Sequence, residues 1–96
     1  MAKQMKSIIQ ENMDECFVCG TTNALHVHHI YYGRKNRDNS TKYHCICRLC
    51  WSHHEGVTGV HHNKNFDDQL KQVTQMAFEK IYSHEEFMRV FGKNYL

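Results

Sequence analysis

The feature that most constrains the fold of this chain is the concentration of metal-binding side chains between Cys16 and His62. All five cysteines and eight of the nine histidines of the 96-residue sequence lie in this window. Such side chains cost stability when they are buried without a partner, and an apolar core is marginal in so short a chain. The sequence therefore predicts one small domain over residues 1–96 that is stabilised by a metal ion.

Charge and hydropathy narrow the class of protein. The formal net charge of +2 is too small to indicate a nucleic-acid partner unless the charge is concentrated in one place. Residues 1–6 lack the apolar stretch of a signal peptide, and no apolar run is long enough to span a membrane. We therefore expect an intracellular, cytoplasmic protein without a membrane partner. In that compartment an odd number of clustered cysteines favours metal binding over disulfides.

The N-terminal two thirds predict a helix and two strands. We expect a short helix over 3–13, within an N-terminal part that spans 1–15. Strands are expected over 25–30 and 43–49, joined by a polar loop at 33–40 that has no periodicity. A short helix is expected to begin near Cys50, with a length limited by Gly56 and Gly59.

The C-terminal third, residues 64–96, predicts two amphipathic helices. A helix over 67–82 follows from apolar residues at helical spacing. Those residues are Leu70, Val73, Ala77 and Ile81. Ser83 and Glu86 form a capping box that begins a last helix, and Gly92 ends it. The residues that this last helix turns inward are Phe87, Val90 and Phe91.

A structural zinc site is predicted from the cysteine spacing. Cys16 and Cys19 have the spacing of half a tetrahedral zinc site, with a turn at the following glycine. Two choices exist for the other half: Cys50 with His53, or Cys47 with Cys50. We prefer the pair Cys50 and His53, because Cys47 is then simply a small buried apolar residue, whereas the alternative leaves His53 without a role.

Two adjacent histidines, His28 and His29, end the first predicted strand. Neighbours on a strand point to opposite faces, so one imidazole is able to hold a metal ion while the other meets a water molecule. The order of the motifs matters more than either residue alone. The chain runs from C-x-x-C through a strand that ends in His-His-Ile to a polar loop, a second strand and Leu-Cys-x-x-His-His.

This order resembles the HNH family of nucleases over about residues 16–62, or roughly half of the chain. The family has a ββα-metal fold, in which two strands and a helix grip one divalent ion. The finer resemblance is to phage-borne recombination-enhancing, RecA-dependent (Ref-type) nucleases. The segments that carry it are His28-His29-Ile30, Gly33-Arg34, Leu49-Cys50-x-x-His53-His54 and Gly59-Val60-His61-x-Asn63-Lys64. The expected fold is thus α+β, a zinc-stapled ββα-metal core over 16–63 between an N-terminal helix and two C-terminal helices.

The resemblance implies a role for each matching histidine. His29 corresponds to the general base that deprotonates the attacking water. His28, His54 and His61 correspond to ligands of the catalytic divalent ion. The resemblance implies Mg²⁺ or Mn²⁺ as that ion and 5′-phosphate products. The central asparagine of the family pattern has no counterpart at the matching spacing.

DNA is the partner that this reading implies. The predicted loop carries Arg34, Lys35 and Arg37 beside the histidines, and Lys64 follows the second histidine segment. Phosphate contacts of this kind hold a duplex without reading its sequence. The resemblance therefore implies a metal-dependent DNA endonuclease of weak sequence specificity that acts in phage recombination or DNA processing and is directed by a RecA-type recombinase filament. The alternatives are a zinc-stapled nucleic-acid binding module without catalysis and a zinc-bearing interaction domain for a recombinase or replication partner.

Overall fold

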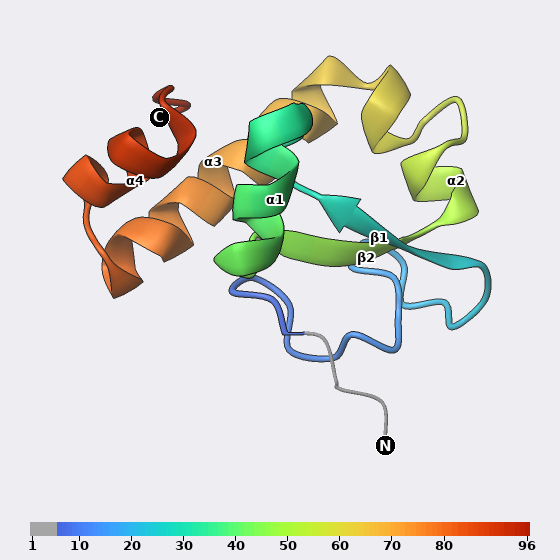
Figure 1. Ribbon diagram of the computed structural model, residues 1–96. Helices are drawn as coiled ribbons and strands as arrows, with labels where there is room; N and C mark the ends of the chain where they lie inside the picture. Colours follow the sequence, from blue (N-terminus) through green and yellow to red (C-terminus); the bar gives the residue numbers. More distant parts are fainter. Residues whose placement is uncertain (1–5) are drawn as a thin grey trace.

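A two-stranded antiparallel sheet lies between two groups of helices in the computed structural model, which describes residues 6–96 (Figure 1). The elements, in chain order, are β1 (Leu25–His29), α1 (Arg34–Lys42), β2 (Ile46–Cys50), α2 (Trp51–His54), a 3-10 turn η1 (Val60–His62), α3 (Lys64–Ile81) and α4 (His84–Phe91). The predicted α+β class is confirmed. Over residues 6–96, no helix combines the length and the apolar character that crossing a membrane requires.

The register of the two strands decides which side chains share a face. Leu25 pairs with Cys50, so His28 lies opposite Cys47. Directly opposed residues of an antiparallel pair lie on the same face, and successive residues alternate between faces. His26 and His28 therefore lie on the face that includes Cys47, while Cys50 points to the other face.

The core forms where the C-terminal helices meet α1 and the segment after β1. Helix α4 contacts both α3 and α1, and Figure 1 shows α3 and α4 together at the end of the sheet opposite α2. Tyr31, Phe78 and Phe87 are fully buried in this region. The predicted start of α4 is confirmed, since the Ser83 hydroxyl accepts a hydrogen bond from the Glu86 amide at 3.0 Å. The inward residues of α4 are also those predicted: Phe87, Val90 and Phe91.

The N-terminal helix predicted over 3–13 is not observed. Residues 3–5 lie outside the described residues, and 6–13 form bends, irregular structure and the start of a turn. Two of the hydrogen bonds of this segment go to distant parts of the chain. The Ile8 amide donates to the His44 carbonyl at 3.0 Å, and the Gln10 side chain accepts from the Arg48 amide at 2.8 Å. The segment is thus tied to β2 and its approach, which replaces the local hydrogen bonds of a helix.

The prediction of a polar loop over 33–40 is wrong, because this segment forms α1. Gly33 precedes the helix at a φ of 97°, which favours glycine. A helix that is polar on nearly all sides gives no hydrophobic period, so its sequence resembles a loop. Tertiary contacts hold it instead. The Asn39 side chain donates to the Val90 carbonyl at 3.0 Å, and the Ser40 hydroxyl donates to the Tyr31 carbonyl at 2.7 Å.

Helix α3 is confirmed, although it begins at Lys64, three residues before the predicted start, and it buries a different face from the one predicted. Leu70 is buried as expected, whereas Val73 and Ile81 are 45% and 57% exposed. The residues that α3 buries are Asp67, Leu70, Thr74, Gln75 and Phe78. The polar members of this set all make hydrogen bonds, although Oδ1 of Asp67 has no partner within residues 6–96. The Gln75 side chain, for example, accepts from the Tyr95 amide at 2.8 Å.

Candidate metal centres

Cys16, Cys19, Cys50 and His53 converge on one point, close enough to hold a metal such as zinc. The Cys19 and Cys50 sulfurs are 3.9 Å apart, and the Cys50 sulfur lies 3.2 Å from Nδ1 of His53. In a tetrahedral site with zinc–sulfur distances of about 2.3 Å, two sulfurs stand roughly 3.8 Å apart. A disulfide needs about 2.0 Å. The spacing therefore fits an ion, and four protein ligands make this a closed, structural kind of site.

Local backbone structure orients the side chains of Cys16 and Cys19. Gly20 adopts a φ of 77° and its amide donates to the Cys16 carbonyl at 2.9 Å, which closes the expected turn. The Phe17 amide donates to the Arg48 carbonyl at 2.8 Å, so the turn is attached to β2. Because Cys50 ends that strand, the two halves of the site are held together by the sheet.

The thiols of Cys16 and Cys47 differ in the direction of their pKa shifts. Burial tends to raise the pKa of the Cys16 thiol, but backbone N–H groups, among them those of Cys19 and Cys50, bring it down to about 6. Such donors favour the thiolate that binds metal. Burial instead raises the pKa of the Cys47 thiol to about 12. Cys47 is fully buried and lies outside the four-residue group. It is an apolar core residue, and His53 completes the set.

A second group joins His28, His54 and His61. One ring nitrogen from each lies within 4.8 Å of the others, and the Nε2 atoms of His54 and His61 are 3.1 Å apart. Two imidazole nitrogens that share an ion at about 2.0–2.1 Å stand roughly 3.0–3.4 Å apart. Nε2 of His28 is buried and has no hydrogen-bond partner within residues 6–96. An orphaned nitrogen beside two other imidazoles fits a metal ligand better than a neutral core histidine.

Burial and neighbouring histidines lower the pKa of two members of this group, His28 and His54. Burial, followed by the proximity of His54 and His61, lowers the pKa of His28 to about 3. Burial and His61 also lower the pKa of His54. Neutral rings offer the lone pairs that a metal ion binds. His28 is buried, His54 is half-buried and His61 is exposed. The group therefore opens to solvent on one side, and with three ligands instead of four it leaves positions for water or phosphate oxygen.

His61 reaches His54 by a turn, not along a continued helix. Helix α2 ends at His54, and the chain folds back through Gly56 and Gly59 into η1. A Cβ built on Gly59 would lie 2.9 Å from the backbone carbonyl carbons of His53 and His54. No side chain fits there. These glycines thus allow the returning backbone to pack directly on α2, which brings His61 beside His54.

Replacing Gly59 by alanine is expected to move η1 away from α2 and to separate His61 from His54, because the contacting atoms are backbone. The expected cost is about 1–3 kcal/mol in the free energy of unfolding, with weaker binding of Mn²⁺ at the histidine group. Urea unfolding and Mn²⁺ titration measure the two effects. An unchanged Mn²⁺ affinity would show that the close approach at Gly59 does not position His61.

The other ring nitrogen of His54 has partners that sequence reasoning missed. Nδ1 of His54 lies 2.9 Å from Nδ1 of His26 and 3.3 Å from a carboxylate oxygen of Glu55. Metal-binding histidines commonly donate their second N–H to such a group, which fixes the tautomer. The position of His26 on this face could be expected, because it lies two residues before His28 on the same strand. No pattern in the sequence indicated Glu55.

His29 and Arg37 lie beside the histidine group. They line one hollow of about 240 Å³ together with His28, His54, His61, Val27 and Tyr32. Burial and the nearby Arg37 lower the pKa of His29, which favours the neutral ring that accepts a proton. The backbone just after His29 is held by Ser40, whose hydroxyl accepts from the Tyr31 amide at 3.1 Å. Ser40 was not predicted from the sequence.

The other predicted DNA contacts do not line this hollow. Arg34 and Lys35 are exposed at the start of α1 and do not line the hollow, whereas Arg37, one turn later, does. Lys64 begins α3 and pairs with Asp68 at 3.0 Å. The structure thus brings Arg37 into the hollow of the histidine group, while Lys64 lines an adjoining hollow with His61. Comparison with protein-family models, with curated proteins and with solved structures found no match for the chain.

Proposed function

We propose that this chain is a metal-dependent endonuclease of the HNH type that hydrolyses DNA phosphodiester bonds. One observation carries the proposal: three histidines able to share an ion line the same hollow as a fourth histidine and an arginine. The sheet and α2, which supply His28 and His54, correspond to the ββα-metal core. A four-ligand site next to this core is a zinc staple, and it leaves the three-ligand site for chemistry.

His29 is the proposed general base. It is adjacent to His28 on β1, yet it is not a member of the histidine group, so its ring is free to take a proton from water. A Mg²⁺ or Mn²⁺ ion, when bound to His28, His54 and His61, supplies positive charge beside the scissile phosphate. Arg37 on the wall of the hollow holds a phosphate oxygen and stabilises the charge that develops on it.

The expected substrate is DNA of no fixed sequence. The cationic residues assigned to this role are Arg34, Lys35, Arg37 and Lys64, which are exposed and so suited to backbone phosphates. We extend the proposal to phage recombination, with a RecA-type filament as the partner that delivers DNA, on the resemblance of the histidine motifs alone. The competing function is a zinc-stapled module that binds nucleic acid without cutting it.

Replacing His29 by alanine is expected to lower the rate of plasmid nicking by about 10²–10⁴-fold, the usual contribution of a general base. The measurement is conversion of supercoiled plasmid to open circles in Mg²⁺ or Mn²⁺, with zinc content determined for both proteins. Equal zinc in wild type and variant shows that the fold is intact. Equal nicking rates would remove His29 from the mechanism. DNA binding without nicking by wild type would favour the binding module.

A further inference from the structure

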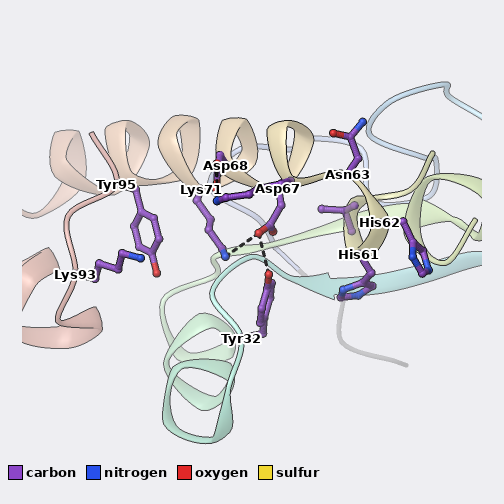
Figure 2. A pocket seen from close by; sticks show the side chains of 11 residues that line it. Tyr32, His61, His62, Asn63, Asp67, Asp68, Lys71, Lys93 and Tyr95 are labelled. Carbon is purple, nitrogen blue, oxygen red and sulfur yellow. Dashed lines mark hydrogen bonds and ion pairs between the residues drawn. The ribbon is translucent and has the colours of Figure 1, made fainter. Parts of the chain in front are cut away.

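A second hollow adjoins the histidine group, and of its lining the function proposed above uses only His61 and Lys64. It has a volume of about 520 Å³ and lies between η1, the first turns of α3 and the C-terminal segment (Figure 2). Its lining is polar, with three lysines and two tyrosines. The lining residues used below are Tyr32, His61, Lys64, Lys71, Lys93 and Tyr95.

The charges in this hollow are paired with one exception. Lys71 and the Tyr32 hydroxyl converge on the Asp67 carboxylate, at 2.9 and 2.8 Å, as Figure 2 shows. Lys64 pairs with Asp68. These contacts neutralise two of the three lysines.

Lys93 is the third lysine. It has no carboxylate within ion-pair distance among residues 6–96, and its ammonium lies 5.3 Å from the centre of the Tyr95 ring. Figure 2 shows the Lys93 side chain running along Tyr95 toward the hollow. The net charge of the hollow is therefore positive, and the free cation is at the end remote from the histidines.

The two hollows form one continuous surface. Tyr32 and His61 line both, so they are the boundary between the site of the proposed reaction and the lysine hollow. Tyr32 is 46% exposed there. On the histidine side of this boundary lies Arg37. Cations thus occur on both sides of the three histidines, as a chain of phosphates crossing them requires.

We propose that the lysine hollow is a subsite for the DNA strand that is cut, and that Lys93 binds a phosphate of that strand beyond the scissile one. The inference rests on the proposed function, because it takes the strand to pass over the histidine group. It assigns the C-terminal segment, which the sequence motifs left without a role, to substrate binding. A flexible polyanion suits the place, since the free lysine supplies charge without the donor pattern that reads a base.

The test is DNA binding by Lys93→Gln, with Lys80→Gln as the matched control. Lys80 is also exposed, but it lines a different hollow with Ile8, Val73 and Met76. The probe is a short fluorescein-labelled single strand, and anisotropy is followed over a salt series without added Mg²⁺ or Mn²⁺. We expect Lys93→Gln to weaken binding about two- to fivefold. The slope of log affinity against log salt should fall by about 0.7, one single-strand phosphate contact. Lys80→Gln should change neither.

Each other outcome has one meaning. Wild-type affinity and slope for Lys93→Gln, in a protein that still nicks plasmid, would overturn the subsite and leave the proposed function intact. Equal losses in the two variants would also overturn it, because they would reflect net charge alone. Absence of DNA binding by wild type would overturn the proposed function and the subsite together.

Discussion

Replacing Cys50 by alanine is expected to remove the structural zinc ion and to abolish the cooperative unfolding transition. Four ligands from two distant segments meet at this site, and Cys50 belongs to β2 itself. A structural zinc contributes about 10–16 kcal/mol of binding free energy, against a net stability of about 5–15 kcal/mol for an ordinary domain. The free energy lost with the ion is therefore larger than the net stability that the small core supplies. Thermal unfolding followed by circular dichroism, together with zinc analysis, measures the effect.

Cys47→Ala is the matched control for Cys50→Ala. Both cysteines are buried on the same strand, but Cys47 points to the opposite face and carries a neutral thiol. Its loss is expected to leave zinc bound at one equivalent and to cost only about 1 kcal/mol, the scale of a small core truncation. Zinc loss from the Cys47 variant would show that Cys47 is a ligand in place of His53.

Replacing His54 by alanine is expected to abolish plasmid nicking while the structural zinc stays in place. His54 contacts His26 and Glu55 through Nδ1 and His61 through Nε2, and it adjoins His53 of the zinc site without belonging to it. Even changes beyond the ligands themselves weaken metal sites by about 10–100-fold. Loss of a ligand should therefore weaken Mn²⁺ binding by at least about 100-fold.

His84→Ala is the control for His54→Ala. His84 is exposed in α4 and lies outside the histidine group and both hollows, so its loss should leave Mn²⁺ affinity and nicking unchanged. Electron paramagnetic resonance of free Mn²⁺ gives the affinity, and zinc content is checked in each protein. Full nicking by the His54 variant would exclude the three histidines as the catalytic metal site.

The candidate site was predictable from the sequence because strand alternation and short ligand spacings are local rules. Cys16 and Cys19 share one turn, and His53 follows Cys50 at the start of α2. Parity also explains why Cys47 is excluded: it is three residues before Cys50 and so points to the other face. The expectation that His28 and His54 meet required only that α2 follow β2 directly.

The parts that were not predictable depend on contacts between distant segments. Helix α1 has little apolar periodicity and is held by hydrogen bonds such as that from Asn39 to Val90. In the N-terminal segment the Ile8 amide donates to the His44 carbonyl, in place of a hydrogen bond within a helix. The return of His61 depends on the absence of a side chain at Gly59. In each case the residue is present in the sequence, but the distant segment that it contacts is known only from the folded structure.

The most direct test of the central claim is whether the zinc-loaded wild-type protein cuts DNA when a divalent ion is added. Supercoiled plasmid is incubated with the protein in Mg²⁺, in Mn²⁺ and without added ion, with and without a RecA-type filament, and the ends formed are analysed. We predict open circles bearing 5′-phosphate ends only where an ion is added. Intact plasmid under every condition, with DNA bound and zinc present, would contradict the assignment of these histidines to a nuclease.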